Sequence, residues 1–273
     1  MIEKDVNSFT GNVRDNRPHL SVVSLRRSVF HETLNLALES FCRSSLVLSL
    51  VLGESSIELV PKELVHHPAV LKSAQRKKKD PAALILDQTY HHAAILRLGS
   101  QGLGRGRPDI AHFCLLLALG SPLNASGKLQ CYVQTRDNNI ITVDPSARLP
   151  RNTDRFTSLI EQLYRERTVP PGKHPLLSLR PGSLGDLVQY ASGQVLALTT
   201  QGVPKTMGHV ASDLATKSNP FLVVGGFPSG HFSKETLSIV KESYRIQREP
   251  LEAWTVVARA IYDYERAIGL DKN

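Results

Sequence analysis

Short apolar runs alternate with helix-like patterns along this chain, and that alternation constrains the fold more than any other feature. The runs are rich in Leu and Val, carry no charge and have the length of buried strands. They occupy residues 46–52, 82–86, 194–199 and 221–224. Apolar residues at helical spacing predict helices over 63–75, 90–98, 110–119, 153–167, 184–191, 234–241 and 252–268. This order predicts an α/β domain with a largely parallel sheet flanked by helices.

A small β-hairpin is predicted inside this alternation. Residues 129–135 and 140–143 flank Arg-Asp-Asn-Asn, a sequence typical of a turn. The proline-rich segment 168–175 is the best candidate for an internal linker, and one sheet continuing across it is the alternative. Residues 1–44 differ in character, because a polar stretch precedes an amphipathic pattern over 30–41 that predicts a helix. We interpret them as an N-terminal extension of unknown role.

Composition excludes several classes of protein. Hydrophobic residues make up 41% of the 273 residues, which argues against a wholly disordered chain. No apolar run approaches the ~20 residues of a membrane helix, and no secretory signal is visible. Cys42, Cys114 and Cys131 lack CxxC spacing, so we expect core thiols in a reducing, cytoplasmic environment. The net charge of +8 favours a polyanionic partner.

Two pairs of adjacent histidines, at 66–67 and 91–92, raise the question of a metal site. Neighbouring residues on a helix point about 100° apart, and no Asp, Glu or Cys stands at ligand spacing from them. We therefore interpret these histidines as structural and predict no metal. The chain also lacks GxSxG, HExxH and P-loop motifs, so nothing suggests a nucleophilic serine or a metal hydrolase.

The first candidate site is the glycine-rich segment 102–110. Arg105 and Arg107 offer planar guanidinium forks suited to phosphate, and Asp109 follows at the start of a predicted helix. The predicted core face of that helix consists of Ile110, Phe113, Leu116 and Leu117. The alternative is a flexible turn in which Asp109 merely favours the helix dipole. The GxGxG spacing follows a helix, which disfavours a dinucleotide-binding motif.

A second candidate is an arginine cluster formed by Arg148, Arg151 and Arg155. Three guanidinium groups within about two helical turns suit successive phosphates of a nucleic acid strand. The alternative is that Arg155 pairs with Asp154 or Glu161 on a solvated helix face. The basic run 76–79 is interpreted as solvated charge.

The third candidate is the glycine loop that follows the apolar run 221–224. Gly225, Gly226 and Gly230, with Pro228 between them, present backbone groups closely to a ligand. Cofactor pockets form in this way at the carboxyl ends of strands. The alternative is a tight connection between a strand and a helix.

Together these segments resemble one family, the pseudouridine-N1-specific ribosomal RNA methyltransferases of the SPOUT, or α/β-knot, superfamily in their archaeal form. The resemblance runs from about residue 45 to about 270. Its motifs, in chain order, are Asp-Gln-Thr-Tyr-His-His (87–92), Arg-Gly-Arg-Pro-Asp-Ile (105–110), Ser-Pro-Leu-Asn (121–124), Arg-Leu-Pro-Arg (148–151) with Arg155, Gly-Gly-Phe-Pro-Ser-Gly (225–230) and Leu-Glu-Ala-Trp-Thr (251–255).

The resemblance implies a trefoil-knotted methyltransferase domain over 45–273, an exception to the rule that chains avoid threading. It also implies a homodimer, a small-subunit rRNA hairpin containing pseudouridine as substrate, a role in ribosome biogenesis and further assembly proteins as partners. S-adenosylmethionine is the implied cofactor. By position, the implied cofactor-binding residues are Leu198, Thr199, Gly225, Gly226, Gly230, Ile246, Gln247, Arg248, Glu249, Pro250 and Leu251.

Within this resemblance, Asp109 and Arg107 match the pair near the target base, and Arg105, Arg107, Arg148, Arg151 and Arg155 are the expected RNA-binding residues. Pseudouridine carries an N1–H that uridine lacks, and that proton must leave as the methyl group arrives. Asp109 is suited to accept it while Arg107 stabilises the developing anionic ring. Two alternatives stay open: a non-catalytic RNA-binding assembly factor, and a related knot methyltransferase acting on tRNA.

Overall fold

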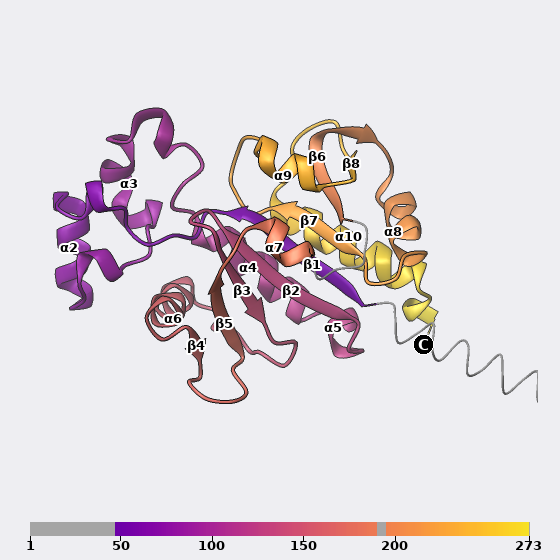
Figure 1. Cartoon of the computed structure of the whole chain (residues 1–273), viewed down its shortest axis with the longest axis horizontal. Coiled ribbons are helices and arrows are strands. Elements are labelled where there is room, and N and C mark those ends of the chain that lie inside the picture. Colours follow the sequence, from indigo (N-terminus) through magenta and orange to yellow (C-terminus); the bar gives the residue numbers. More distant parts are fainter. Residues whose placement is uncertain (1–46, 190–194, 273) are drawn as a thin grey trace, which may run out of the picture. The chain divides into compact units, whose positions relative to one another are not determined.

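A mixed sheet forms the centre of the structure, a computed structural model that describes residues 47–189 and 195–272. Eight strands follow the spatial order β4-β5-β3-β2-β1-β7-β6-β8 (Figure 1). Their bounds are β1 Leu48–Ser55, β2 Leu129–Thr135, β3 Asn139–Val143, β4 Thr168–Val169, β5 Leu177–Pro181, β6 Val195–Pro204, β7 Phe221–Gly225 and β8 Glu242–Arg245. Strands β2, β1, β7, β6 and β8 are parallel, and β3, β5 and β4 add an antiparallel edge. The predicted α/β fold with a largely parallel sheet is confirmed.

Helices cover both faces of this sheet (Figure 1). They are α2 Pro68–Lys77, α3 Gln88–Leu96, α4 Pro108–Leu119, α5 Pro122–Ala125, α6 Thr153–Glu166, α7 Leu184–Val188, α8 Met207–Ala215, α9 Lys234–Ile239 and α10 Ala253–Ala267. Successive strand residues point to opposite faces. In β1, Leu50 and Leu52 therefore join the core with α4, α6, α8 and α10, whereas Val51 joins the core beneath α7 and α9. Both faces of β1 are buried, which explains its uninterrupted apolar sequence.

Helices α2 and α3, which lie between β1 and α4 in the sequence, form a small lobe with an apolar core of its own. A buried carboxylate, Glu161 of α6, holds this lobe. Its oxygens accept hydrogen bonds from Lys77 Nζ at 3.1 Å, Lys79 Nζ at 2.5 Å and the backbone N–H of Ile85 at 3.3 Å. The interpretation of the basic run 76–79 as solvated charge is therefore wrong for these two lysines. Since a buried carboxylate requires partners, the fold recruits cations 82 and 84 residues away.

The predicted strand over 82–86 does not form. Pro81–Ala83 make a 3₁₀ helix capped by Asp80, and only Ile85 makes an isolated antiparallel bridge, to Leu59. Leu84 and Leu86 of this run instead fill the core of the α2–α3 lobe, and both are fully buried. A short apolar run has no period that separates a strand from other buried segments, which is why the prediction failed.

Other boundaries moved for local reasons. The predicted helix over 63–75 is broken before Pro68, where His67 caps the N-terminus of α2 by accepting the N–H of Ala69. The segment 168–175 is not a domain linker, because β4 and β5 on its two sides pair with each other in one sheet. The hairpin is confirmed as β2 and β3. Strands β4, β5 and β8 and helix α8 were not predicted, and the predicted helix over 30–41 lies outside the described residues.

The end of β6 bows around β8. Tyr244 of β8 aligns with both Leu198 and Val203 of β6, so residues 199–202 loop past it. A Cβ on Gly202 would stand 2.6 Å from the backbone of Tyr244, so this close approach requires glycine. The predicted trefoil knot remains a prediction.

Candidate active site

A cavity of about 310 Å³ opens where the parallel strands β6, β7 and β8 end. The carboxyl ends of adjacent parallel strands are the usual place for a ligand in an open α/β sheet. Its walls are Leu198, Thr199, Thr200, Val224, Gly225, Phe227, Pro228, Ser229, Gly230, His231, Phe232, Tyr244, Arg245, Ile246, Gln247, Glu249, Pro250, Leu251, Ala253 and Val256.

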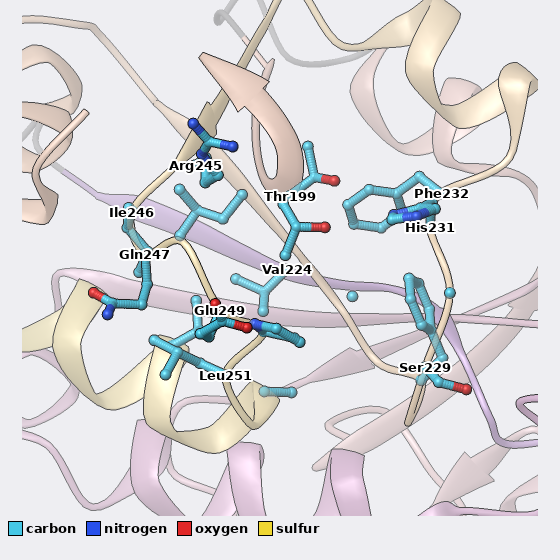
Figure 2. Close-up of a pocket in the computed structure, with 18 of the residues that line it drawn as sticks. Thr199, Val224, Ser229, His231, Phe232, Arg245, Ile246, Gln247, Glu249 and Leu251 are labelled. Carbon is cyan, nitrogen blue, oxygen red and sulfur yellow. The ribbon is translucent and has the colours of Figure 1, made fainter. Parts of the chain in front are cut away.

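Two loops face each other across this cavity. Figure 2 shows Ser229, His231 and Phe232 on one side and Ile246, Gln247 and Leu251 on the other, with Thr199 and Val224 between them. Apolar side chains and loop backbone dominate the lining, a combination that holds a flat heterocycle and binds its polar edge. A left-handed Gly230, at φ +103°, has open space where a Cβ would project.

Most of the predicted cofactor-binding residues line the cavity: Leu198, Thr199, Gly225, Gly230, Ile246, Gln247, Glu249, Pro250 and Leu251. Arg248 is not part of the lining. Gly226 is not either, because it packs on β1. Its N–H donates to the Gly53 carbonyl at 2.8 Å, and a Cβ would stand 2.1 Å from Ser55 Oγ. Gly226 is therefore a packing glycine that lets β7 lie close to β1, which corrects its predicted role.

The aromatic side chains of the cavity were not predicted from the sequence. Phe227 and Phe232 meet edge to face, with ring centroids 5.5 Å apart. A Cβ on Gly225 would stand 2.8 Å from the Phe227 ring, so glycine lets this ring fold back. The sequence feature that could have indicated them is the presence of one phenylalanine inside the 225–230 loop and another two residues after it. Tyr244 offered no such feature, because β8 is a short edge strand of mixed polarity.

Arg107 and Asp109 form a bidentate ion pair at the N-terminus of α4. Both Arg107 Nε–Asp109 Oδ1 and Arg107 Nη2–Asp109 Oδ2 measure 2.8 Å, and each side chain is about 30% exposed. The Asp109 carboxylate raises the pKa of Arg107, and the nearby charges of Glu252 and Asp87 add to this effect. Gly104, three residues before Arg107, stands close to the cavity wall, because a Cβ on it would lie 3.7 Å from the Ser229 carbonyl, so the loop that leads to the pair borders the cavity.

Arg105 is placed differently from its prediction. Its guanidinium pairs with the carboxylate of Glu58, and the two side chains are only 12% and 7% exposed. The Glu58 hydrogen bonds raise the pKa of Arg105. A phosphate would have to displace a buried carboxylate, so this arginine fastens the glycine loop to the segment after β1 instead of offering a free charge.

Arg148, Arg151 and Arg155 are all exposed, and none has an ion pair with a described carboxylate. The alternative in which Arg155 pairs with Asp154 or Glu161 is wrong. Glu161 holds the two lysines of α2, and Asp154 accepts the Tyr90 hydroxyl at 2.8 Å. Arg155 lines a shallow groove with Pro150, Leu159 and other α6 residues. The segment 148–155 therefore carries three exposed guanidinium groups that have no ion pair among the described residues.

Helix α4 connects this arginine loop to the Arg107–Asp109 pair. His112, one turn after Asp109, stacks on Phe156 at 4.4 Å, and its Nε2 lies 2.6 Å from the Pro150 carbonyl. The loop between Arg148 and Arg151 is thus anchored to the helix that carries Asp109.

Two cysteines lie among the described residues, and both are buried. Burial raises the pKa of the Cys114 and Cys131 thiols to about 12, as expected for core thiols; Cys42 lies outside the described residues. Within residues 47–189 and 195–272, no three His, Cys, Asp or Glu side chains gather as metal ligands would. Over the same ranges, no helix has the length and hydropathy needed to cross a membrane.

Comparison with known proteins agrees with this geometry. The profile of the EMG1/NEP1 methyltransferase family matches residues 50–265. The ribosomal RNA small subunit methyltransferase Nep1 of Pyrococcus furiosus is 42% identical over 222 residues, covering 80% of this chain and 96% of that protein. The Nep1 of Thermococcus kodakarensis is 42% identical over 233 residues, covering 82% and 100%. The crystal structure of Archaeoglobus fulgidus Nep1 bound to S-adenosylhomocysteine superposes with a TM-score of 0.72 at 32% identity, covering 82% of this chain and 99% of that one. The chain therefore belongs to the EMG1/NEP1 methyltransferase family.

Proposed function

We propose that this protein methylates N1 of a pseudouridine in small-subunit ribosomal RNA, with S-adenosylmethionine as the methyl donor. The observation that carries the proposal is the contact between the Gly104 loop, which leads to the Arg107–Asp109 ion pair, and the Ser229 loop of the cavity wall. Further support comes from relatives named as small subunit rRNA methyltransferases and from a related structure bound to S-adenosylhomocysteine.

The cavity fits such a cofactor. Leu198, Val224 and Leu251 offer an apolar surface for the adenine ring, and Gly230, which has open space where a Cβ would project, leaves its backbone accessible to a ligand. When bound, S-adenosylmethionine supplies an electrophilic methyl group together with its own leaving group. The chain then needs neither a nucleophile nor a metal.

The residues beside the cavity supply the remaining chemistry. As the N1–CH₃ bond forms, the N1–H proton must leave, and the Asp109 carboxylate is the acceptor. Arg107, already fixed by two hydrogen bonds to Asp109, places a permanent positive charge where the ring becomes electron-rich. Carboxylates are weak bases compared with imidazole or amines, so positioning of the base contributes more than basicity.

The target base must leave its RNA loop to reach this pair. Arg148, Arg151 and Arg155 are the proposed backbone contacts, since their guanidinium groups are exposed and unpaired among the described residues. Arg105 is left out of this surface because Glu58 engages it.

The proposal extends to the organisation of the protein. Residues 45–273 are proposed to form the methyltransferase domain, supported by a compact unit over Ser45–Asn273, and residues 1–44 an extension outside it. We further propose a cytoplasmic homodimer that acts in ribosome biogenesis alongside other assembly proteins. Exposed apolar residues on α4, Phe113 and Leu117, support the dimer.

Transfer of labelled methyl groups to an rRNA hairpin with one pseudouridine tests the reaction. The Asp109→Asn variant should lose 10²–10⁴-fold in transfer rate, as expected when a general base is removed. Its affinity for S-adenosylhomocysteine should stay within about twofold, because Asp109 is not part of the cavity wall. Asp80→Asn is the matched control, because Asp80 is an exposed N-cap residue and asparagine caps a helix about as well as aspartate.

Other outcomes would change the assignment. RNA binding without transfer by the wild-type protein would indicate a non-catalytic assembly factor. Transfer to tRNA but not to the rRNA hairpin would indicate a related enzyme with another substrate. Equal losses of transfer and RNA binding in Asp109→Asn would make Asp109 a structural residue.

A further inference from the structure

Arg136 lies where three functional segments meet. It is the first residue after β2, and its backbone N–H donates to the Ser55 carbonyl at 3.0 Å. A Cβ on Gly104 would stand 3.8 Å from Nη1 of Arg136 and 3.7 Å from the Ser229 carbonyl. Gly104 belongs to the loop that leads to Arg107, and Ser229 is part of the cavity wall (Figure 2). The guanidinium therefore lies close to the Gly104 loop, which leads to the Arg107–Asp109 pair, at the point where this loop meets the Ser229 loop of the cavity.

The charge of Arg136 is not neutralised within the described part of the chain. The side chain is exposed and has no ion pair to a described carboxylate. Nearby acids are engaged elsewhere. Asp137 Oδ1 accepts the Thr135 hydroxyl at 2.5 Å and the Tyr164 hydroxyl at 3.0 Å, and Glu54 Oε1 accepts the Ser233 N–H at 2.9 Å.

The loop beside Arg136 is fixed rather than loose. Ser56 Oγ donates to the Gly104 carbonyl at 2.5 Å, and the Arg105–Glu58 pair follows directly. Gly104 has φ +72°, a left-handed conformation that favours glycine. The missing side chain leaves space beside the Arg136 guanidinium, and a rigid rim of this kind can hold an anion in one position.

We propose that Arg136 binds the phosphate on the 5′ side of the flipped pseudouridine and so positions its base between the cavity and the Arg107–Asp109 pair. This inference rests on the proposed function. A phosphodiester is the anion that accompanies every flipped nucleotide, and a guanidinium fork matches its two free oxygens. Arg148, Arg151 and Arg155 hold the neighbouring strand, whereas Arg136 holds the reacting nucleotide itself.

The test compares Arg136→Gln, Arg136→Lys and a matched control, Arg165→Gln, which alters an exposed α6 arginine paired with Glu166. RNA affinity is measured across a salt series, together with methyl transfer and affinity for S-adenosylhomocysteine. Arg136→Gln should weaken RNA binding about 5–20-fold and reduce the salt slope by about 0.7, the value for one single-strand phosphate. Lysine should restore part of the loss, and cofactor affinity should not change.

A hairpin with an uncharged methylphosphonate at the 5′ linkage identifies the contact. It should weaken binding to the wild-type protein as much as Arg136→Gln does, with no further loss in the variant. Losses that multiply, or an Arg136→Gln variant that binds like the wild type, would overturn the inference while the wild type still transfers methyl groups. A wild-type protein with no transfer would overturn the proposed function and this inference with it.

Discussion

At the residue scale, the choice of partner decides what each arginine can do. Arg105 and Arg107 are two residues apart and look alike in sequence. Glu58 nevertheless binds Arg105 in a nearly buried pair, whereas Asp109 binds Arg107 in a partly exposed pair at the N-terminus of α4. Arg151 and Arg155 have no such partner among the described residues. Positive charge alone therefore does not identify the RNA surface, and the position of each carboxylate does.

His91 is a second case in which the surroundings set the chemistry. It is 1% exposed, its Nδ1 accepts the Asp87 N–H at 3.1 Å, and its buried Nε2 has no partner. Burial lowers the pKa of His91 to about 4, and the charges of Lys77 and Arg76 act in the same direction. The structural interpretation of this histidine is consistent with these contacts.

A pH dependence of stability follows from His91. Above pH 6.5 the ring is neutral in both states; below it the unfolded chain binds a proton and the folded chain does not until about pH 4. The free energy of unfolding should therefore fall as the pH is lowered from 6.5 to 4, by about 3 kcal/mol from this residue. Urea unfolding across this pH range measures it.

Two variants isolate the contribution. His91→Asn keeps an acceptor for the Asp87 N–H and removes the titrating ring, so it should flatten the pH dependence. His92→Gln alters an exposed neighbour and should leave it intact. An NMR titration that places the His91 pKa near 6.5 in the folded protein would contradict the argument.

At the scale of elements, the α2–α3 lobe and α6 are fastened by polar contacts on both sides of Tyr90. The Arg76 guanidinium lies 4.1 Å from the centroid of the Tyr90 ring, and the Tyr90 hydroxyl donates to Asp154 of α6. The Tyr90 hydroxyl holds the Asp154 carboxylate toward the lobe, and Arg155 makes no ion pair with a described carboxylate. The negative charge of Asp154 remains, but it is directed away from Arg155.

Tyr90→Phe tests this connection. The ring and its contact with Arg76 remain, but the Asp154 carboxylate is freed to turn into the groove that it lines with Arg155, so RNA affinity should fall by about threefold, the size expected for an exposed charge interaction. The double variant Tyr90→Phe/Asp154→Asn removes that negative charge, so its affinity should return at least to the wild-type value in a filter-binding assay. Wild-type affinity in Tyr90→Phe alone would show that Asp154 does not compete for the arginine.

At the scale of the whole molecule, the sheet gathers the loops of the cavity at the carboxyl ends of its parallel strands. Five strands are parallel, so the segments after them meet beside the cavity: β1, β2, β6, β7 and β8.

Helix α4 was predicted to bury Phe113 and Leu117, but they are 41% and 44% exposed. The buried stripe of α4 instead runs through Ala111, Cys114, Leu115 and Ala118.

The exposed apolar face of α4 gives a prediction for assembly. Phe113 and Leu117 lie one turn apart, with Trp254 of α10 edge-on to Phe113 at 5.5 Å, and they suit the proposed dimer contact. Phe113→Glu should convert a dimer to a monomer in light-scattering measurements. Leu71→Glu, at an exposed leucine of α2, should not. A monomeric wild-type protein at micromolar concentration would contradict the proposed dimer.

The sequence by itself determined the α/β class, the central strands, the hairpin and the family. Strand and helix periods are local, and the glycine and arginine motifs stand in short segments. Nine of the eleven residues predicted for the cofactor line one cavity, since they lie at the bulge of β6 or at and after the ends of β7 and β8. The sequence shows directly which loop follows which strand, so these residues could be predicted from it.

Only the tertiary structure decided which charged and small residues meet. Glu161 binds lysines 82 and 84 residues away, Arg105 reaches Glu58 over 47 residues, and Tyr90 reaches Asp154 over 64. The same holds for Gly226, which packs on Ser55 instead of lining the cavity. The energy of such a contact depends on the distance and burial of both partners, and a local pattern contains only one of them.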